Sequence, residues 1–139
     1  MRDVILDTNI FVRFFVQDIE DQFQKARNIF TRIEKGELLG FVSVLVINEI
    51  IWILDSYYEI ERKVYIPLLL NILALKNIKI LEIGKEVIMK VLERMEKQKV
   101  DFTDIYLFQV AGSREIFSFD KDFIKLGRKN AKDGWHRRS

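Results

Sequence analysis

Four acidic residues stand beside segments that the sequence predicts to be buried. Asp7 follows the apolar run Val4–Leu6, and Asp120 follows a later apolar run. Glu49 lies among isoleucines in a strongly apolar stretch, and Asp104 lies at the start of another. A carboxylate is costly to bury unless it is paired or binds a cation. These four acids are therefore the candidate functional residues.

Four carboxylates that gather at one place would have a distinctive chemistry. Like charges raise one another's pKa unless a cation neutralises them. Ligand sets made only of oxygen select a hard divalent ion, Mg²⁺ or Mn²⁺, which keeps several waters and leaves room for a phosphate. Such an ion activates a water molecule and stabilises the charge that develops on a phosphodiester. The acids thus predict metal-dependent hydrolysis that needs no protein nucleophile.

Each acid also has a purely structural interpretation. Asp101 and Asp104 resemble the cap and first turn of a helix, where acids satisfy free N–H groups and favour the helix dipole. Asp120 is placed to cap a short helical turn that follows it, and Asp7 to accept N–H bonds in a turn. Glu49 has the weakest structural interpretation, because a carboxylate on the inner side of an apolar helix is seldom left without a partner. Singly, each acid favours a structural role; together, they favour a functional one.

Strands that alternate with helices must position these acids. The first strand, being apolar throughout, is expected to be covered on both faces. We expect strands where short apolar runs end in polar residues, over Val4–Leu6, Leu38–Val42, Ile78–Leu81 and Glu115–Phe119. Apolar residues at helical spacing predict helices over Ile10–Val16, Asp18–Gly36, Val44–Tyr58, Arg62–Leu75, Lys85–Gln98, Thr103–Ala111 and Asp122–Leu126.

This alternation implies an α/β fold, a three-layer α/β/α arrangement around a central, mostly parallel sheet of four to five strands. Ser43 is expected to cap the helix that carries Glu49, and Gly36 to end the helix before it. Because the carboxyl ends of parallel strands share one edge of a sheet, Asp7 and Asp120 are expected at the same edge.

Composition bounds the class of protein. The 139 residues suit one domain over residues 1–127, followed by a basic tail over 128–139. Hydrophobic content of 49% and charged content of 32% indicate a folded, globular chain. The lack of cysteine excludes disulfides, zinc thiolates and cysteine nucleophiles, and fits a cytoplasmic location. No apolar run reaches the roughly 20 residues of a membrane span, and a net charge of +2 permits a nucleic-acid partner. His136, the single histidine, lies in the tail and is not expected to be catalytic.

Three phenylalanines mark one face of the first predicted helix. Phe11, Phe14 and Phe15 fall at positions i, i+3 and i+4. General burial preferences favour a place in the core. The alternative is a contact surface for a second copy of the chain, since three such rings on a short helix are hard to bury.

At the acidic residues the chain resembles a PIN-domain ribonuclease, and most closely the VapC-type toxins of bacterial and archaeal toxin–antitoxin pairs. The resemblance covers nearly the whole chain, from Val4 to about Leu126. Four segments in this order carry it: Leu6-Asp7-Thr8-Asn9, Asn48-Glu49, Asp101-Phe102-Thr103-Asp104 and Ser118-Phe119-Asp120-Lys121-Asp122-Phe123. Each segment alone is weakly diagnostic, whereas all four at these separations are fairly specific.

The resemblance implies a Mg²⁺-dependent endoribonuclease, with Mn²⁺ as a plausible substitute. It assigns Asp7, Glu49, Asp104 and Asp120 as an acidic quartet that holds the metal. Asp7 and Asp104 are the first candidates for direct metal ligands. In this interpretation a metal-activated water attacks an RNA phosphodiester.

The resemblance also suggests supporting residues. Asn9 corresponds to a residue that usually lines the site. Ser118 stands where the family usually has threonine, and either hydroxyl can donate to a neighbouring acid or water. Asp122 is a near neighbour of Asp120 and an alternative fourth acid.

Two partners besides RNA follow from the resemblance. Such toxins commonly form homodimers, and a small antitoxin inhibits them by placing its C-terminal segment in the cleft. The Phe11, Phe14, Phe15 face would serve either contact. Many relatives finish with one more strand, whereas the tail of this chain shows no strand periodicity. Its basic residues would hold RNA phosphates, unless the tail is simply solvated.

The alternative function is a non-enzymatic PIN-fold module that binds RNA or a protein through apolar and basic surfaces. The presence of all four acids argues against such a decayed site. A phosphatase with an aspartyl nucleophile is less well supported. It would usually carry a second acid two residues after Asp7, where this chain has Asn9.

Overall fold

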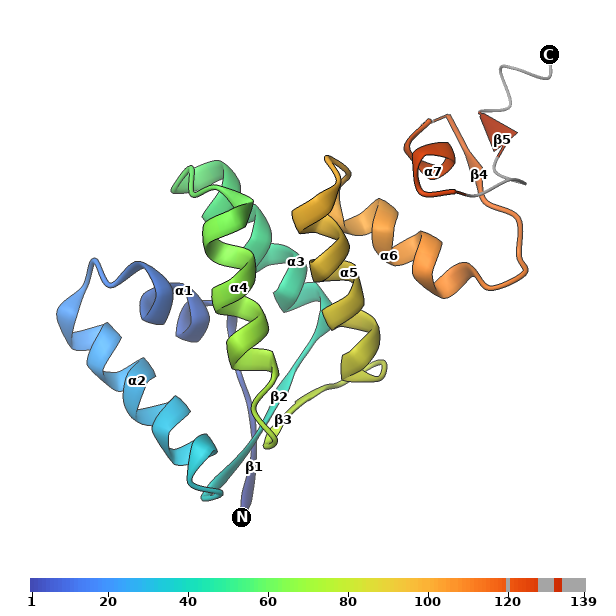
Figure 1. Ribbon diagram of the computed structural model, residues 1–139. Helices are drawn as coiled ribbons and strands as arrows, with labels where there is room; N and C mark the ends of the chain where they lie inside the picture. Colours follow the sequence, from blue (N-terminus) through green and yellow to red (C-terminus); the bar gives the residue numbers. More distant parts are fainter. Residues whose placement is uncertain (120, 128–131, 134–139) are drawn as a thin grey trace. The chain divides into compact units, whose positions relative to one another are not determined.

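The computed structural model describes residues 1–119, 121–127 and 132–133. The chain forms two compact units, an N-terminal unit of Met1–Met89 and a C-terminal unit of Lys90–Ser139. Figure 1 labels the helices and strands of both units. The division into one domain over 1–127 and a tail over 128–139 stays a prediction.

A parallel three-stranded sheet forms the centre of the N-terminal unit. Its strands are β1 (Arg2–Ile5), β2 (Leu38–Val42) and β3 (Ile78–Ile80), in the order β1-β2-β3. Ile5 pairs with Phe41, and Val42 pairs with Ile80. The carboxyl ends of the three strands therefore lie at one edge of this sheet, as predicted.

Helices connect and flank these strands (Figure 1). They are α1 (Thr8–Val16), α2 (Glu20–Glu34), α3 (Val44–Trp52), a π-helical turn η1 (Ile53–Tyr57) and α4 (Arg62–Leu73). The next helix, α5 (Lys85–Lys97), begins in this unit and continues into the C-terminal unit. Alternating strands and helices with parallel pairing confirm the predicted α/β class and its three-layer α/β/α arrangement.

The C-terminal unit contains the rest of α5, then α6 (Phe102–Ala111), β4 (Phe117–Ser118), α7 (Asp122–Lys125) and β5 (Lys132–Asp133). Strands β4 and β5 pair in parallel, with Phe117 opposite Lys132. The tail was predicted to lack strand structure. This prediction was wrong, because Lys132 and Asp133 of the tail pair with β4. The predicted four to five strands occur, in the described residues, as one sheet of three and one of two.

Several helix ends follow the predicted chemistry. Ser43 caps α3, and its Oγ accepts a hydrogen bond from the Leu45 N–H at 3.1 Å. Gly36 adopts a positive φ of 82° two residues after α2 ends, and its N–H donates to the Ile33 carbonyl. The predicted continuous helix over Val44–Tyr58 differs in its second half, which widens into the turn η1.

Close packing of α2 against the sheet explains a buried glycine in β2. A Cβ added to Gly40 would lie 3.0 Å from the side chains of both Ile33 and Leu6. Phe11 is fully buried, and its ring meets that of Phe30 at 5.4 Å between centroids. The core interpretation of the phenylalanine face is thus confirmed for Phe11.

The prediction for the first strand was partly wrong. The side chain of Ile5 is 72% exposed, and that of Val4 is only partly buried. The physical reason is that successive side chains of a strand point to opposite faces of the sheet, and the face of Ile5 is not covered. Leu6, just beyond β1, is 2% exposed and belongs to the core.

Within the described ranges, no helix is both long and apolar enough to span a membrane.

Candidate active site

Asp7 lies where β1 ends and α1 begins. The chain leaves the sheet through Leu6, whose N–H donates to the Phe41 carbonyl at 2.9 Å. Asp7 then occupies the N-cap position of α1 with extended backbone angles, and its carbonyl accepts from the Ile10 N–H at 3.1 Å. Its side chain is exposed and accepts no capping hydrogen bond from α1. The carboxylate is thus at the carboxyl end of a strand without serving as a cap.

Thr8 connects this turn to α3. Its side chain is 3% exposed, and its Oγ1 donates a hydrogen bond to Oε1 of Glu49. Thr8 directly follows Asp7, so the contact brings Glu49 to the region of the first acid. Within the N-terminal unit, Glu49 therefore contacts the residue that follows Asp7.

Glu49 occupies a different side of its helix from the one we predicted. The isoleucines Ile47, Ile50 and Ile51 are buried, whereas Glu49 is exposed. The prediction of an inner-side carboxylate was wrong because α3 presents this position toward Thr8 and not toward the apolar core. The exposed carboxylate of Glu49 nevertheless accepts a hydrogen bond, from the Thr8 hydroxyl.

A further acid at the same sheet edge has a structural role. Glu82, two residues after β3, accepts hydrogen bonds from the Ser43 hydroxyl at 2.5 Å and the Val44 N–H at 2.8 Å. Burial opposes the ionised form of Glu82, but these hydrogen bonds outweigh it and lower the pKa of the carboxyl. Sequence reasoning missed Glu82, because its partners lie 38 and 39 residues away.

Asn9 is exposed in the first turn of α1, next to Thr8. One turn further along α1, Arg13 donates to Asp18 at 2.7 Å and to the Tyr58 hydroxyl at 3.4 Å. The hydrogen bond with Asp18, opposed by partial burial, is the main reason that the pKa of Arg13 is raised. Asn9 and Arg13, four residues apart, therefore lie on the same side of α1.

The other predicted acids belong to the C-terminal unit. Asp101 occupies the predicted N-cap position of α6, but its side chain makes no capping hydrogen bond. The partly exposed Asp104 lies in the first turn of that helix. Ser118 is the last residue of β4. Asp122 begins α7 and forms a salt bridge with Lys125 at 3.2 Å. Asp120 lies outside the described residues.

The donors of the N-terminal site fit a hard divalent ion. Its carboxylates, Asp7 and Glu49, and the hydroxyl of Thr8 supply oxygen only, which is the ligand type of Mg²⁺ and Mn²⁺. Within the described ranges, no three His, Cys, Asp or Glu side chains are grouped closely enough to hold a metal. The joining of acids from both units into one quartet stays a prediction.

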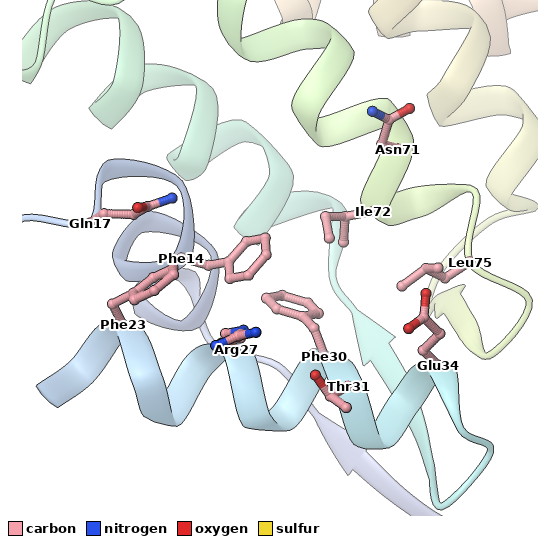
Figure 2. Close-up of a pocket in the computed structure, with 10 residues that line it drawn as sticks. All are labelled: Phe14, Gln17, Phe23, Arg27, Phe30, Thr31, Glu34, Asn71, Ile72 and Leu75. Atoms are coloured by element: carbon pink, nitrogen blue, oxygen red, sulfur yellow. The ribbon is translucent and has the colours of Figure 1, made fainter. Parts of the chain in front are cut away.

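An apolar groove lies on the other side of α1, between α1, α2 and α4 (Figure 2). It has a volume of about 430 Å³ and a floor that includes Phe14, Phe30 and Leu75. The Phe14 ring lies 4.9 Å from the Phe30 ring and stacks on that of Phe23 at 5.9 Å. One side of the predicted phenylalanine face thus lines a surface groove.

Comparison with known proteins gives one finding. A family model described as PIN domain matches residues 4–129. The search of the curated proteins found no match, and the search of the solved structures found none.

Proposed function

The chain belongs to the PIN-domain family, and we propose that it is a Mg²⁺-dependent endoribonuclease, the toxin of a toxin–antitoxin pair in the cytoplasm. PIN domains are commonly nucleases and typically use divalent metals, so a nucleic-acid substrate is the expectation for the family. The observation that best supports the proposal is the Thr8–Glu49 hydrogen bond, which brings a second carboxylate to the turn of Asp7.

In the proposed reaction the carboxylates of Asp7, Glu49, Asp104 and Asp120 hold the ion. When bound, a divalent ion lowers the pKa of a coordinated water and stabilises the charge on the phosphate. Thr8 is a positioning residue, because its hydroxyl occupies Oε1 of Glu49 and leaves Oε2 for the site. The exposed carboxylate of Asp7 is not consumed by helix capping and is therefore available as a ligand.

Two other residues have supporting roles in this proposal. The Asn9 amide, one residue after Thr8, would line the site beside the bound RNA. The Ser118 hydroxyl would donate to a neighbouring acid or water. Neither group changes its covalent state in the reaction.

The antitoxin is proposed to cover the groove of Figure 2. The groove offers aromatic rings for apolar side chains and two charged rim residues, Arg27 and Glu34, of opposite sign. An apolar surface with a polar rim is typical of a site for a protein segment. A small upstream reading frame that encodes a DNA-binding protein would supply the antitoxin. Phe14→Glu, which places a charge in the groove, should abolish binding of that antitoxin.

A homodimer is part of the same proposal. Three large apolar residues are 42–62% exposed: Trp52 of α3, and Val64 and Leu68 of α4. Such side chains supply a surface on which a second copy buries apolar area. Sedimentation of a single monomeric species at micromolar concentration would contradict the dimer and leave the nuclease proposal intact.

Calorimetric titration with Mn²⁺ tests the proposed metal site. We expect saturable binding by the wild-type chain and binding at least tenfold weaker in Asp7→Asn. Asp3→Asn is a matched control, since Asp3 is an exposed acid of β1 away from the strand's carboxyl end. No binding to the wild-type chain at millimolar Mn²⁺ would contradict the enzyme and favour the non-enzymatic module.

A further inference from the structure

A second, smaller pocket lies between α1 and α2, beside the candidate active site. It is lined by Asn9, Ile10, Arg13, Gln22, Lys25 and Ala26. Asn9 belongs to the same helical turn as Thr8, which donates to Glu49. We propose that this pocket holds one nucleobase of the RNA substrate next to the phosphodiester that is cut, an inference that rests on the proposed function.

The size and walls of the pocket suit a single base. Its volume is about 170 Å³, below the roughly 300–1,000 Å³ of sites for drug-sized ligands. Ile10 and the buried Ala26 supply apolar surface. Bases in single-stranded loops, bulges and ends of RNA can be splayed out, so proteins bind their faces on flat side chains and read their edges with hydrogen bonds.

Two side-chain amides supply the hydrogen-bonding groups. Asn9 comes from α1 and Gln22 from α2, and both are exposed. Each amide offers a donor and an acceptor, and neither amide is hydrogen-bonded to another part of the described chain. A base edge also combines donors and acceptors, in an order that differs between bases. An amide pair across the pocket is therefore suited to prefer some bases over others.

Two cations flank these amides and fit the phosphate that accompanies a base. Lys25 pairs with Asp21 at 3.2 Å, and the two side chains are 75% and 79% exposed. Exposed ion pairs of this kind contribute little stability, so the Lys25 ammonium readily exchanges its partner for a phosphate. Arg13 is instead held by Asp18 at 2.7 Å, so its guanidinium lines the pocket in a fixed position. Its remaining N–H groups can donate to a phosphate.

The test uses the four nucleoside 5′-monophosphates, which carry a base and a phosphate but no phosphodiester to cut. Each is titrated into the ¹⁵N-labelled full-length chain with Mg²⁺ present, and the side-chain amide signals of Asn9 and Gln22 are followed by NMR. We expect both signals to shift, with at least a threefold difference in Kd between the best and worst base.

Gln22→Leu keeps the bulk of the side chain and removes its amide, and the exposed position leaves the core untouched. We expect this variant to bind the preferred monophosphate about three- to tenfold more weakly, the loss of one uncharged hydrogen bond, and to equalise the four bases. Gln24→Leu is the matched control, because Gln24 lies on the same helix and bonds to Glu20 outside the pocket. It should bind like the wild type.

Equal affinities for all four bases, unshifted Asn9 and Gln22 signals, or equal losses in the two leucine variants would each overturn the pocket assignment. Cleavage of RNA is measured separately on the same wild-type sample. Base-selective binding without Mg²⁺-dependent cleavage would overturn the nuclease and keep the pocket as a nucleotide site. Cleavage whose base preference is unchanged in Gln22→Leu would overturn the pocket and keep the nuclease.

Discussion

The buried hydroxyl of Thr8 donates a hydrogen bond to the carboxylate of Glu49, 41 residues further along the chain. This contact fixes the start of α1 against α3. At the end of β1, the neighbouring residues Asp7 and Thr8 therefore have different roles. Asp7 presents a carboxylate to solvent, while Thr8 faces inward and orients the next acid.

Replacement of Thr8 should therefore weaken the site without removing any acid. Thr8→Val keeps the shape of the side chain and loses the donor, and a hydrogen bond to a charged group contributes about 1.5–3 kcal/mol. We expect kcat/KM for RNA cleavage to fall about 10- to 100-fold. Thr8→Ser, which retains the hydroxyl, should stay within about threefold of the wild type. Equal activity in Thr8→Val and the wild type would show that the contact does not position Glu49.

The choice between Asp120 and Asp122 as the fourth acid can be made by mutation. The carboxylate of Asp122 pairs with Lys125 at 3.2 Å and begins α7, where an acid also favours the helix dipole. We expect Asp120→Asn to lower kcat at least about 100-fold and Asp122→Asn less than about threefold. Cleavage assays of both variants at saturating RNA measure this directly. The reverse order of losses would make Asp122 the fourth acid.

The hydrogen bonds that the Glu82 carboxylate accepts at the start of α3 predict a pH dependence of stability. Because folding lowers the pKa of Glu82, the folded state favours its ionised form, and this stabilisation is present above the ordinary pKa of 4.5. It is lost as pH falls through the lower, folded pKa. Thermal melts of the wild type and Glu82→Gln should differ by about 2–5 °C at pH 7, and the difference should close toward pH 3. A difference in melting temperature that stays constant across this pH range would show that the ionised Glu82 carboxylate is not its cause.

Neutralising an acid of the proposed site should have the opposite effect on stability. Removal of one of several crowded like charges relieves repulsion, so Asp7→Asn without metal should melt at or slightly above the wild-type temperature. Added Mn²⁺ should then raise the melting temperature of the wild type more than that of Asp7→Asn. Equal metal-induced shifts would place the bound ion away from Asp7.

Much of the fold was predictable because its signals are local. The limits of β2 follow from the apolar run that ends at Ser43, and the cap at Ser43 follows from the residue type. Gly36 ends α2 because only a residue that tolerates positive φ suits that position. In each case the deciding interaction involves residues a few positions apart.

The errors have different physical causes. The exposure of Ile5 depends on which face of the sheet is covered, which apolar character alone does not indicate. Glu49 lies outside the apolar face of α3, because the buried Ile47, Ile50 and Leu54 follow helical spacing that leaves position 49 off that face. Its bond with Thr8, in contrast, leaves no local pattern in the sequence. Strand β5 is two residues long and is defined by its pairing with β4. So short a strand shows no alternation of apolar and polar residues from which it could be predicted. A threonine directly after a strand-end aspartate was the one available hint of the Thr8 contact.

The most direct test of the central claim is cleavage of a defined RNA panel with Mg²⁺, with Mn²⁺ and with a chelator. The account predicts cleavage with either metal by the wild type and by Asp3→Asn. It predicts none with the chelator, and at least about a 1,000-fold loss in Asp7→Asn and Asp104→Asn. Undiminished cleavage in the chelator or in either of these two variants, or no cleavage by the wild type under any condition, would contradict it.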